Sequence, residues 1–245
     1  MATKDGTFYP PSIANCFAWY DADDASSIVL NGADVAQWND KSGNGYHLVQ
    51  GTGALQPEYL AAAIGGKYGV SFSSEWLEAT PANYTGNFLT VYAVCERTGS
   101  AGFSTPIDFR KSTETDDTST EGQSRIWDGR DGTQQRSSRG AVFKSTINSD
   151  PGTGVTMLMR YFADNVTNQI FRYTGVEGEV FGDDNASVSA YDSDRILICS
   201  RYIASAYTKF WIGYMGEMIL YTSAIAKDSA EDRRIRNYLL SKWSI

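Results

Sequence analysis

The chain has 245 residues, of which 42% are hydrophobic, 20% charged and 13% aromatic, and its formal net charge at pH 7 is −8. These values are typical of a globular protein, and the length suits one large all-β domain. The negative charge argues against non-specific nucleic-acid binding, which needs clustered Lys and Arg side chains. No apolar run approaches the roughly 18 residues of a membrane span, and the polar first residues hold no apolar segment of a secretory signal.

The first 12 residues contain Pro10 and Pro11 and are expected to form an extended arm. Residues 13–245 are expected to form a single domain, because no linker or internal repeat divides them. Short alternating segments bounded by Gly, Asn and Pro predict strands along most of this length. In chain order these segments are 14–20, 28–30, 35–38, 46–50, 69–72, 76–78, 88–95, 141–147, 155–162, 168–173, 179–181, 195–200 and 210–221.

Two of the predicted strands, 88–95 and 195–200, are apolar on both faces and are expected at the centre of a sheet. The stretch 111–140 is different, since it is long, polar and almost free of aliphatic residues. A polar stretch of this length inside a domain is expected to be a functional or flexible loop.

One helix is expected, near the C-terminus. Asp228 is expected as its N-cap and Glu231 as its third helical residue (N3), which together form a capping box. Apolar residues then recur at three- and four-residue spacing, among them Ile235, Leu239 and Trp243. Many short strands followed by one helix predict an all-β sandwich.

Few residue types suited to catalysis or metal binding are present. Cys16, Cys95 and Cys199 are far apart and lie in apolar runs, so they are expected to be free buried thiols of a protein made in a reducing cytosol. The single histidine, His47, excludes His-rich metal sites and leaves a Ser–His or Cys–His pair with one possible base.

Two blocks at opposite ends of the chain carry a family resemblance. The first comprises residues 19–26, 35–45, 57–59 and 70–72, and the second comprises residues 216–221 and 238–243. Together they resemble the concanavalin A-like, laminin-G-like jelly-roll domains of tailed-phage virion proteins and bacterial surface proteins. The resemblance implies a two-sheet antiparallel jelly-roll β-sandwich with one C-terminal helix. It also implies that the N- and C-terminal strands pair in one sheet and that Trp243 covers the end of this sheet.

The segment 40–45, Asp-Lys-Ser-Gly-Asn-Gly, matches the first half of a calcium loop. The twelfth position, where a bidentate Glu closes such a loop, holds Gly51. Two interpretations stay open: a self-capped turn, or a calcium site completed by aspartates of the 21–24 turn. No cofactor is expected apart from this calcium ion. The candidate ligands are Asp21, Asp23, Asp40 and Asn44.

No catalytic set is recognisable. Laminarinase-type hydrolases that share the implied fold carry Glu-x-Asp-x-Glu on one strand, and the nearest run here is Glu177-Gly178-Glu179 in a Gly-rich turn. Retaining hydrolysis needs two carboxyl groups about 5 Å apart, and no such pair can be named. The protein is therefore expected not to be an enzyme, with glycoside hydrolysis as the weakest alternative.

Glycan binding in such folds uses aromatic platforms together with Asp, Asn and Arg side chains on loops. Residues 124–131 and 201–207 have this composition. The alternative for Trp127 is that it anchors the long loop on the core. The candidate ligand-binding residues are Trp127, Asp128, Arg130, Tyr202 and Tyr207.

These observations favour a non-enzymatic phage virion surface protein, either a capsid decoration protein or a tail-associated module, with host-surface glycan binding as an added role. The alternative is a carbohydrate-binding lectin module of a bacterial or phage adhesin. The expected partners are other virion proteins, a surface polysaccharide and further copies of the chain in a homo-oligomer such as a trimer, with no nucleic acid and no membrane. The expected location is the virion surface, after assembly in the host bacterial cytoplasm.

Overall fold

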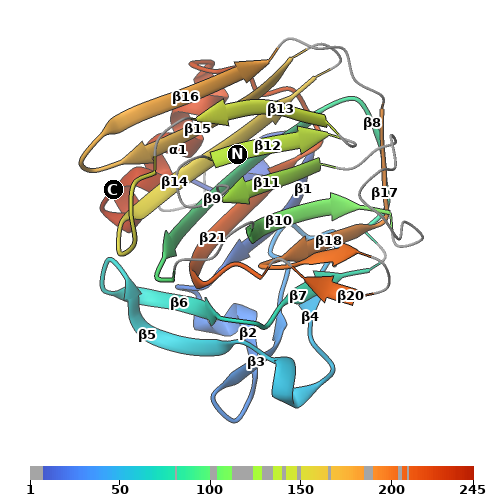
Figure 1. The fold of residues 1–245 in the computed structure, drawn as a ribbon, viewed down its shortest axis with the longest axis vertical. Helices are drawn as coiled ribbons and strands as arrows, with labels where there is room; N and C mark the ends of the chain where they lie inside the picture. The colour runs from blue at the N-terminus through green and yellow to red at the C-terminus, as the bar shows by residue number, and fades with distance from the viewer. Residues whose placement is uncertain are drawn as a thin grey trace.

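Antiparallel strands dominate the fold (Figure 1). The computed structural model describes residues 8–80, 82–99, 104–111, 124–128, 135–139, 142–147, 150–164, 167–184, 190–203, 206–208 and 210–245. In these ranges the chain forms 21 strands, three short 3₁₀ helices and one α-helix, α1 (Ala230–Trp243). The all-β sandwich with a single C-terminal helix is therefore confirmed. No helix in these ranges is long and apolar enough to cross a membrane.

The 3₁₀ helices are η1 (Pro10–Ser12), η2 (Ala25–Ser27) and η3 (Gly53–Leu55). The strands of the first half are β1 (Cys16–Asp21), β2 (Ile28–Asn31), β3 (Asp34–Trp38), β4 (Leu48–Val49), β5 (Glu58–Ile64), β6 (Lys67–Phe72), β7 (Leu77–Ala79), β8 (Tyr84–Gly86), β9 (Leu89–Arg97), β10 (Ser104–Arg110) and β11 (Ser124–Asp128). Those of the second half are β12 (Gln135–Arg139), β13 (Val142–Ile147), β14 (Thr156–Ala163), β15 (Asn168–Thr174), β16 (Gly178–Asp184), β17 (Tyr191–Ser193), β18 (Arg195–Ile198), β19 (Arg201–Ile203), β20 (Ala206–Thr208) and β21 (Gly213–Tyr221).

One layer of the sandwich runs β1–β21–β9–β14–β15–β16, and every neighbouring pair is antiparallel. Strand β9 lies between β14 and β21, so the prediction of a central strand at 88–95 is confirmed. The implied pairing of the two ends of the chain is also confirmed, because β1 pairs with β21 from Cys16–Tyr221 to Asp21–Glu217.

The other layer runs β4–β7–β18–β10–β11–β12–β13. Strand β18 lies between β7 and β10, which confirms the second predicted central strand at 195–200. Strands β11 and β12 lie within the stretch 111–140 that was predicted to be a loop. That prediction is wrong for these two strands, because a strand paired on both sides is held by backbone hydrogen bonds and needs no aliphatic run.

Alternation along β9 separates two hydrophobic clusters. Val91, Ala93 and Cys95 belong to the cluster between the layers, whereas Tyr92 and Val94 belong to a second cluster that faces α1. From the helix, Ile235, Leu239 and Trp243 complete the second cluster, and each is at most 1% exposed. Helix α1 therefore covers the outer face of the β9 layer (Figure 1).

Helix α1 begins one residue later than the sequence predicts. Its N-cap is Ser229, whose hydroxyl accepts the N–H of Asp232 at 3.1 Å. Asp228 instead adopts a left-handed φ of 59° and ion-pairs with Arg236. The predicted pair Asp228 and Glu231 is therefore replaced by Ser229 and Asp232, because it is Asp232 that meets a buried partner, Arg160 at 2.9 Å.

The first described residues lie against the domain. The ring of Tyr9 meets Trp19 edge-on with centroids 5.6 Å apart, and the Tyr221 hydroxyl donates to the Pro10 carbonyl at 3.1 Å. Pro10–Ser12 form a 3₁₀ turn and not an extended segment. Residues 1–7 of the predicted arm lie outside the described residues.

All three cysteines are free, as predicted, and Cys95 and Cys199 are fully buried. Burial raises the pKa of the half-buried Cys16 to about 12, and the nearby Asp40 carboxylate adds to the rise. Burial likewise raises the pKa of the Cys199 thiol well above its ordinary value. Since the thiolate is the reactive form, a raised pKa keeps both thiols mainly protonated near neutral pH.

Candidate functional site

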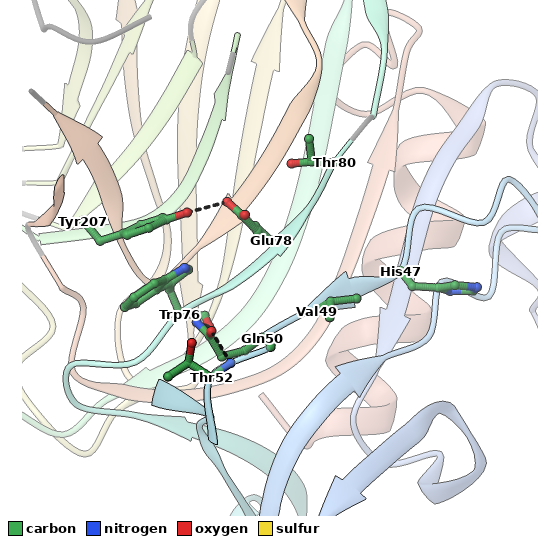
Figure 2. A pocket seen from close by; sticks show the side chains of 9 residues that line it. His47, Val49, Gln50, Thr52, Trp76, Glu78, Thr80 and Tyr207 are labelled. Carbon is green, nitrogen blue, oxygen red and sulfur yellow. Dashed lines mark hydrogen bonds between the residues drawn. The ribbon is translucent and has the colours of Figure 1, made fainter. Parts of the chain in front are cut away.

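A pocket of about 400 Å³ opens beside β4 and β7 (Figure 2). Trp76 and Tyr207 lie one over the other at one end of it, His47 marks the far end, and Glu78 and Val49 lie between them in this view (Figure 2). The described lining residues are His47, Val49, Gln50, Gly51, Thr52, Trp76, Glu78, Thr80 and Tyr207.

The alternation of β7 places Glu78 in the pocket. Leu77 and Ala79 point into the core and are at most 1% exposed, so the residue between them points outward. Strand β7 pairs with β4 through Val49 and with β18 through Leu197, both opposite Glu78. The carboxylate therefore stands on a rigid strand that is paired on both sides.

The rings of Trp76 and Tyr207 stack with centroids 3.9 Å apart and an interplanar angle of 20°. Tyr207 lies on the short hairpin of β19 and β20, in which it pairs with Tyr202, and the two rings meet edge-on at 5.0 Å. Phe210 lies 6.2 Å from Trp76. All four rings are half-buried, so they form an aromatic platform that is still partly open to solvent.

The Glu78 carboxylate is fixed by two partners on one oxygen. The Tyr207 hydroxyl donates to Glu78 Oε2 at 2.9 Å, and Arg195 Nη1 lies 3.5 Å from the same oxygen. Burial raises the pKa of Tyr207 to about 12, and the Glu78 charge adds to the rise, so the phenol stays a donor at neutral pH. The Arg195 guanidinium also lies 5.0 Å from the centre of the Tyr202 ring.

The side of the pocket near the β4 end is built around Gln50. Its side-chain amide donates to the Trp76 carbonyl at 3.3 Å, and its side-chain oxygen accepts the Thr52 N–H at 3.1 Å. The Gln56 amide donates to the Gln50 carbonyl at 2.7 Å. His47 Nδ1 accepts the Asp40 N–H at 3.0 Å, which ties this end of the pocket to the 40–45 turn.

The structure brings together part of the predicted glycan site. Tyr202 and Tyr207 are neighbours beside the pocket, whereas Trp127 and Asp128 lie in β11 and Arg130 lies outside the described residues. Sequence reasoning missed Trp76 and Glu78, which were interpreted only as part of a strand. The available signal was the polar Glu78 between two apolar residues, since alternation predicts that such a side chain faces outward.

The 40–45 segment forms a self-capped turn that holds β1. The Asp40 carboxylate accepts the N–H groups of Trp19, Ser42 and Tyr46 at 2.8 to 3.1 Å. The Asn44 amide donates to the carbonyls of Cys16 and Phe17, both at 2.9 Å.

The other two candidate calcium ligands have lysine partners. Asp21 pairs with Lys41 at 3.0 Å and with Lys242 at 2.6 Å, and Asp23 pairs with Lys67 at 2.8 Å. Within the described ranges, no group of three or more His, Cys, Asp or Glu residues is arranged to hold a metal ion. Of the two interpretations of this segment, the observed contacts match the self-capped turn.

Hydrogen bonds to one buried carboxylate, that of Glu217, connect residues near the two ends of the chain. Glu217 on β21 is fully buried, and its carboxylate accepts the indole N–H of Trp19 at 2.8 Å and that of Trp243 at 2.9 Å. Tyr238 donates to it at 2.8 Å, and Lys242 pairs with it at 2.8 Å. Burial, with the nearby Asp21 charge, raises the pKa of the Glu217 carboxyl, and Lys242 opposes this rise. With four donors around it, Glu217 has a structural role.

The Glu177-Gly178-Glu179 run does not form a carboxylate pair directed at a pocket. Glu177 pairs with Arg172 at 2.5 Å, and Glu179 pairs with Lys227 at 2.8 Å. Both carboxylates therefore belong to ion pairs around β15, β16 and the segment before α1.

No family model matches the chain, and no curated protein matches it by sequence. Among solved structures it is similar to an arabinofuranosidase complexed with arabinofuranosyl-α-1,2-xylobiose, with a TM-score of 0.64 and 15% identity over 85% of this chain and 51% of that one. It is also similar to domain 4 of a GH43 extracellular arabinanase from Geobacillus stearothermophilus in complex with arabinotriose. The TM-score is 0.59 and the identity 13%, over 91% of this chain and 98% of that domain. A Trypanosoma rangeli sialidase in complex with sialic acid gives a TM-score of 0.59 and 12% identity, over 94% of this chain and 33% of the sialidase.

These likenesses show a shared fold, and the chain spans about half the length of the arabinofuranosidase. They correct the resemblance to phage concanavalin A-like domains, because the similar structures belong to glycoside hydrolases and sialidases. They also correct the expectation of a non-enzymatic protein, because the similar structures include arabinofuranosidases and a sialidase, which are enzymes. A virion-surface location, virion partners and a trimeric state stay predictions.

Proposed function

We propose that the chain binds an oligosaccharide in the pocket of Trp76, Glu78 and Tyr207. The observation that carries this proposal is the stacked Trp76–Tyr207 pair beside a partly exposed carboxylate. The C–H face of a sugar ring packs on an aromatic face, and its hydroxyl groups donate to carboxylate oxygens. A ligand pocket with aromatic walls and a few fixed polar groups meets both requirements.

The size of the pocket supports the same proposal. Its volume of about 400 Å³ lies in the range of small-molecule sites. The exposed hydroxyl groups of Thr52 and Thr80 add polar contacts at its rim. The arabinanase domain with which the chain shares most of its length is complexed with arabinotriose. Arabinotriose is therefore the first probe, with xylotriose and lactose as further neutral probes.

Replacement of Trp76 by Ala is expected to weaken arabinotriose binding at least about tenfold, which corresponds to about 1.4 kcal/mol. The variant loses the aromatic face on which the sugar packs. Isothermal titration calorimetry measures the dissociation constant, and circular dichroism checks that the variant is folded.

Tyr68→Ala provides the matched control for this variant. Tyr68 is a 41% exposed aromatic residue on β6, stacked on Tyr59 and outside the pocket lining. Its removal is expected to leave arabinotriose binding unchanged. Wild-type affinity in folded Trp76→Ala, or no binding of any of the three neutral probes to the wild-type chain, contradicts the proposal.

Glycoside hydrolysis in the same pocket is a second candidate function, favoured by the partly exposed Glu78 carboxylate. Hydrolysis uses two carboxyl groups on either side of the scissile bond, and Glu78 is the carboxylate among the described lining residues. Release of arabinose from arabinotriose by the wild-type chain, lost in Glu78→Gln, would establish this activity and assign Glu78 to it.

A further inference from the structure

The charge of the pocket is set by Glu78, because it is the one acidic residue among the described lining residues and none of them is Lys or Arg. We infer that the pocket selects neutral oligosaccharides over acidic ones and that Glu78 is the residue that determines this selectivity. The inference rests on the proposed oligosaccharide binding and names the class of sugar that the site accepts.

The two oxygens of the Glu78 carboxylate have different surroundings. Oε2 accepts the Tyr207 hydroxyl at 2.9 Å and lies 3.5 Å from Arg195 Nη1. Oε1 has no hydrogen-bond partner among the described residues, and the side chain is 27% exposed. An ionised carboxylate only accepts hydrogen bonds, so a ligand forms a hydrogen bond with Oε1 only through a donor group of its own.

Sugar hydroxyl groups supply such donors, whereas the carboxylate of an acidic sugar does not. Two carboxylates at hydrogen-bonding distance repel each other by several kcal/mol when the effective dielectric constant is about 20. An acidic sugar whose carboxylate enters the pocket is therefore disfavoured, and a neutral sugar of the same shape is accepted.

Arg195 does not reverse this selectivity. Its side chain is 11% exposed and lies outside the pocket lining, and its guanidinium packs on the Tyr202 ring. Its Nε and Nη1 atoms are buried, so a ligand in the pocket does not reach these two donors. Arg195 therefore orients Glu78 from behind Oε2 and leaves the Oε1 side negatively charged.

The neutral groups of the pocket do not form a carboxylate site either. The Gln50 side-chain amide already donates to Trp76, and the Tyr207 hydroxyl already donates to Glu78. The His47 ring points away from Trp76 and Tyr207 and accepts the Asp40 N–H (Figure 2). The described side-chain donors left for a ligand are the hydroxyl groups of Thr52 and Thr80, the second amide N–H of Gln50 and the Nε2–H of His47, and none of them comes from Lys or Arg.

The test compares two derivatives of arabinotriose that differ in one group. Reduction of its reducing end gives the neutral arabinotriitol, and oxidation gives the anionic arabinotrionic acid. At low salt, wild-type protein is expected to bind the acid at least about tenfold more weakly than the alditol. In Glu78→Gln the ratio of the two dissociation constants is expected to fall below about threefold, because the amide is neutral and donates as well as accepts.

Glu58→Gln serves as the matched control, because Glu58 is an exposed strand residue outside the pocket and its replacement should leave the ratio unchanged. Equal binding of the acid and the alditol to the wild-type chain, with arabinotriose still bound, overturns the selectivity and leaves the proposed function intact. An unchanged ratio in folded Glu78→Gln overturns the role of Glu78. Failure of all neutral probes to bind overturns the proposed function and this inference with it.

Discussion

A chain that ends at Leu220 is expected to remain unfolded. The truncation removes α1 and with it Ile235, Leu239 and Trp243, which are at most 1% exposed and pack on the outer face of the β9 layer. Burial of one large apolar side chain contributes about 1.5 to 3 kcal/mol. Three of them together approach the whole stability of a typical domain, about 5 to 15 kcal/mol.

The truncation also leaves buried charges without partners. Arg160 on β14 is fully buried, ion-paired with Asp232 at 2.9 Å and 4.6 Å from the centre of the Phe171 ring. Its Nη2 also donates to the Ile225 carbonyl and its Nε to the Tyr92 hydroxyl at 3.3 Å, so residues beyond Leu220 supply its ion-pair partner and one of its two neutral acceptors. Removal of one partner of a buried pair costs about 3 to 5 kcal/mol, because the remaining charge is uncompensated.

Far-ultraviolet circular dichroism and urea titration of residues 1–220 measure this effect. The expected result is a chain without a cooperative unfolding transition. The point variant Asp232→Ala isolates the electrostatic part and is expected to lose about 3 to 5 kcal/mol. Glu231→Ala, at the exposed neighbouring position on α1, is the control and should stay within about 0.5 kcal/mol. A soluble 1–220 fragment that unfolds cooperatively contradicts the prediction.

The parts of this fold that sequence predicts best are those with a local periodic signal. The apolar run of β9 and the three- and four-residue spacing of α1 each identified an element and the side that it buries. The start of α1 was displaced by one residue, because the choice between Asp228 and Ser229 depends on Arg160, a distant residue that only the fold places beside Asp232. Strands β11 and β12 lacked a local signal altogether, because their pairing is a backbone interaction with neighbouring strands.

The candidate site was predicted in part, for a similar reason. The aromatic composition of residues 201–207 was visible in the sequence, and it led to Tyr202 and Tyr207. Their partner Trp76 lies 131 residues before Tyr207, and no local pattern marks two rings that stack across such a separation. The hydrogen bond from Tyr207 to Glu78 spans 129 residues and is equally invisible in the sequence. The site is a product of the pairing of β7 with β18, which places the β19–β20 hairpin beside it.

Replacement of Glu217 by Ala is expected to lower the free energy of unfolding by about 3 to 5 kcal/mol. The carboxylate is fully buried and accepts from Trp19, Tyr238, Lys242 and Trp243. Without it, two indole N–H groups lose their acceptor inside the protein, and each buried unsatisfied donor costs about 1 to 3 kcal/mol. Urea denaturation measures the loss, and Glu58→Ala, at an exposed position on β5, is the control with an expected change within about 0.5 kcal/mol.

A double variant tests whether the loss comes from uncompensated partners. Lys242 is 16% exposed and has a second partner, since it also pairs with Asp21 at 2.6 Å. Lys242→Met removes the half-buried ammonium group that loses its Glu217 partner in Glu217→Ala. The double variant is therefore expected to be less destabilised than the sum of the two single variants. If the losses in the free energy of unfolding of the two single variants simply add, Glu217 and Lys242 do not interact. A loss below about 1 kcal/mol in Glu217→Ala would contradict the structural role of Glu217.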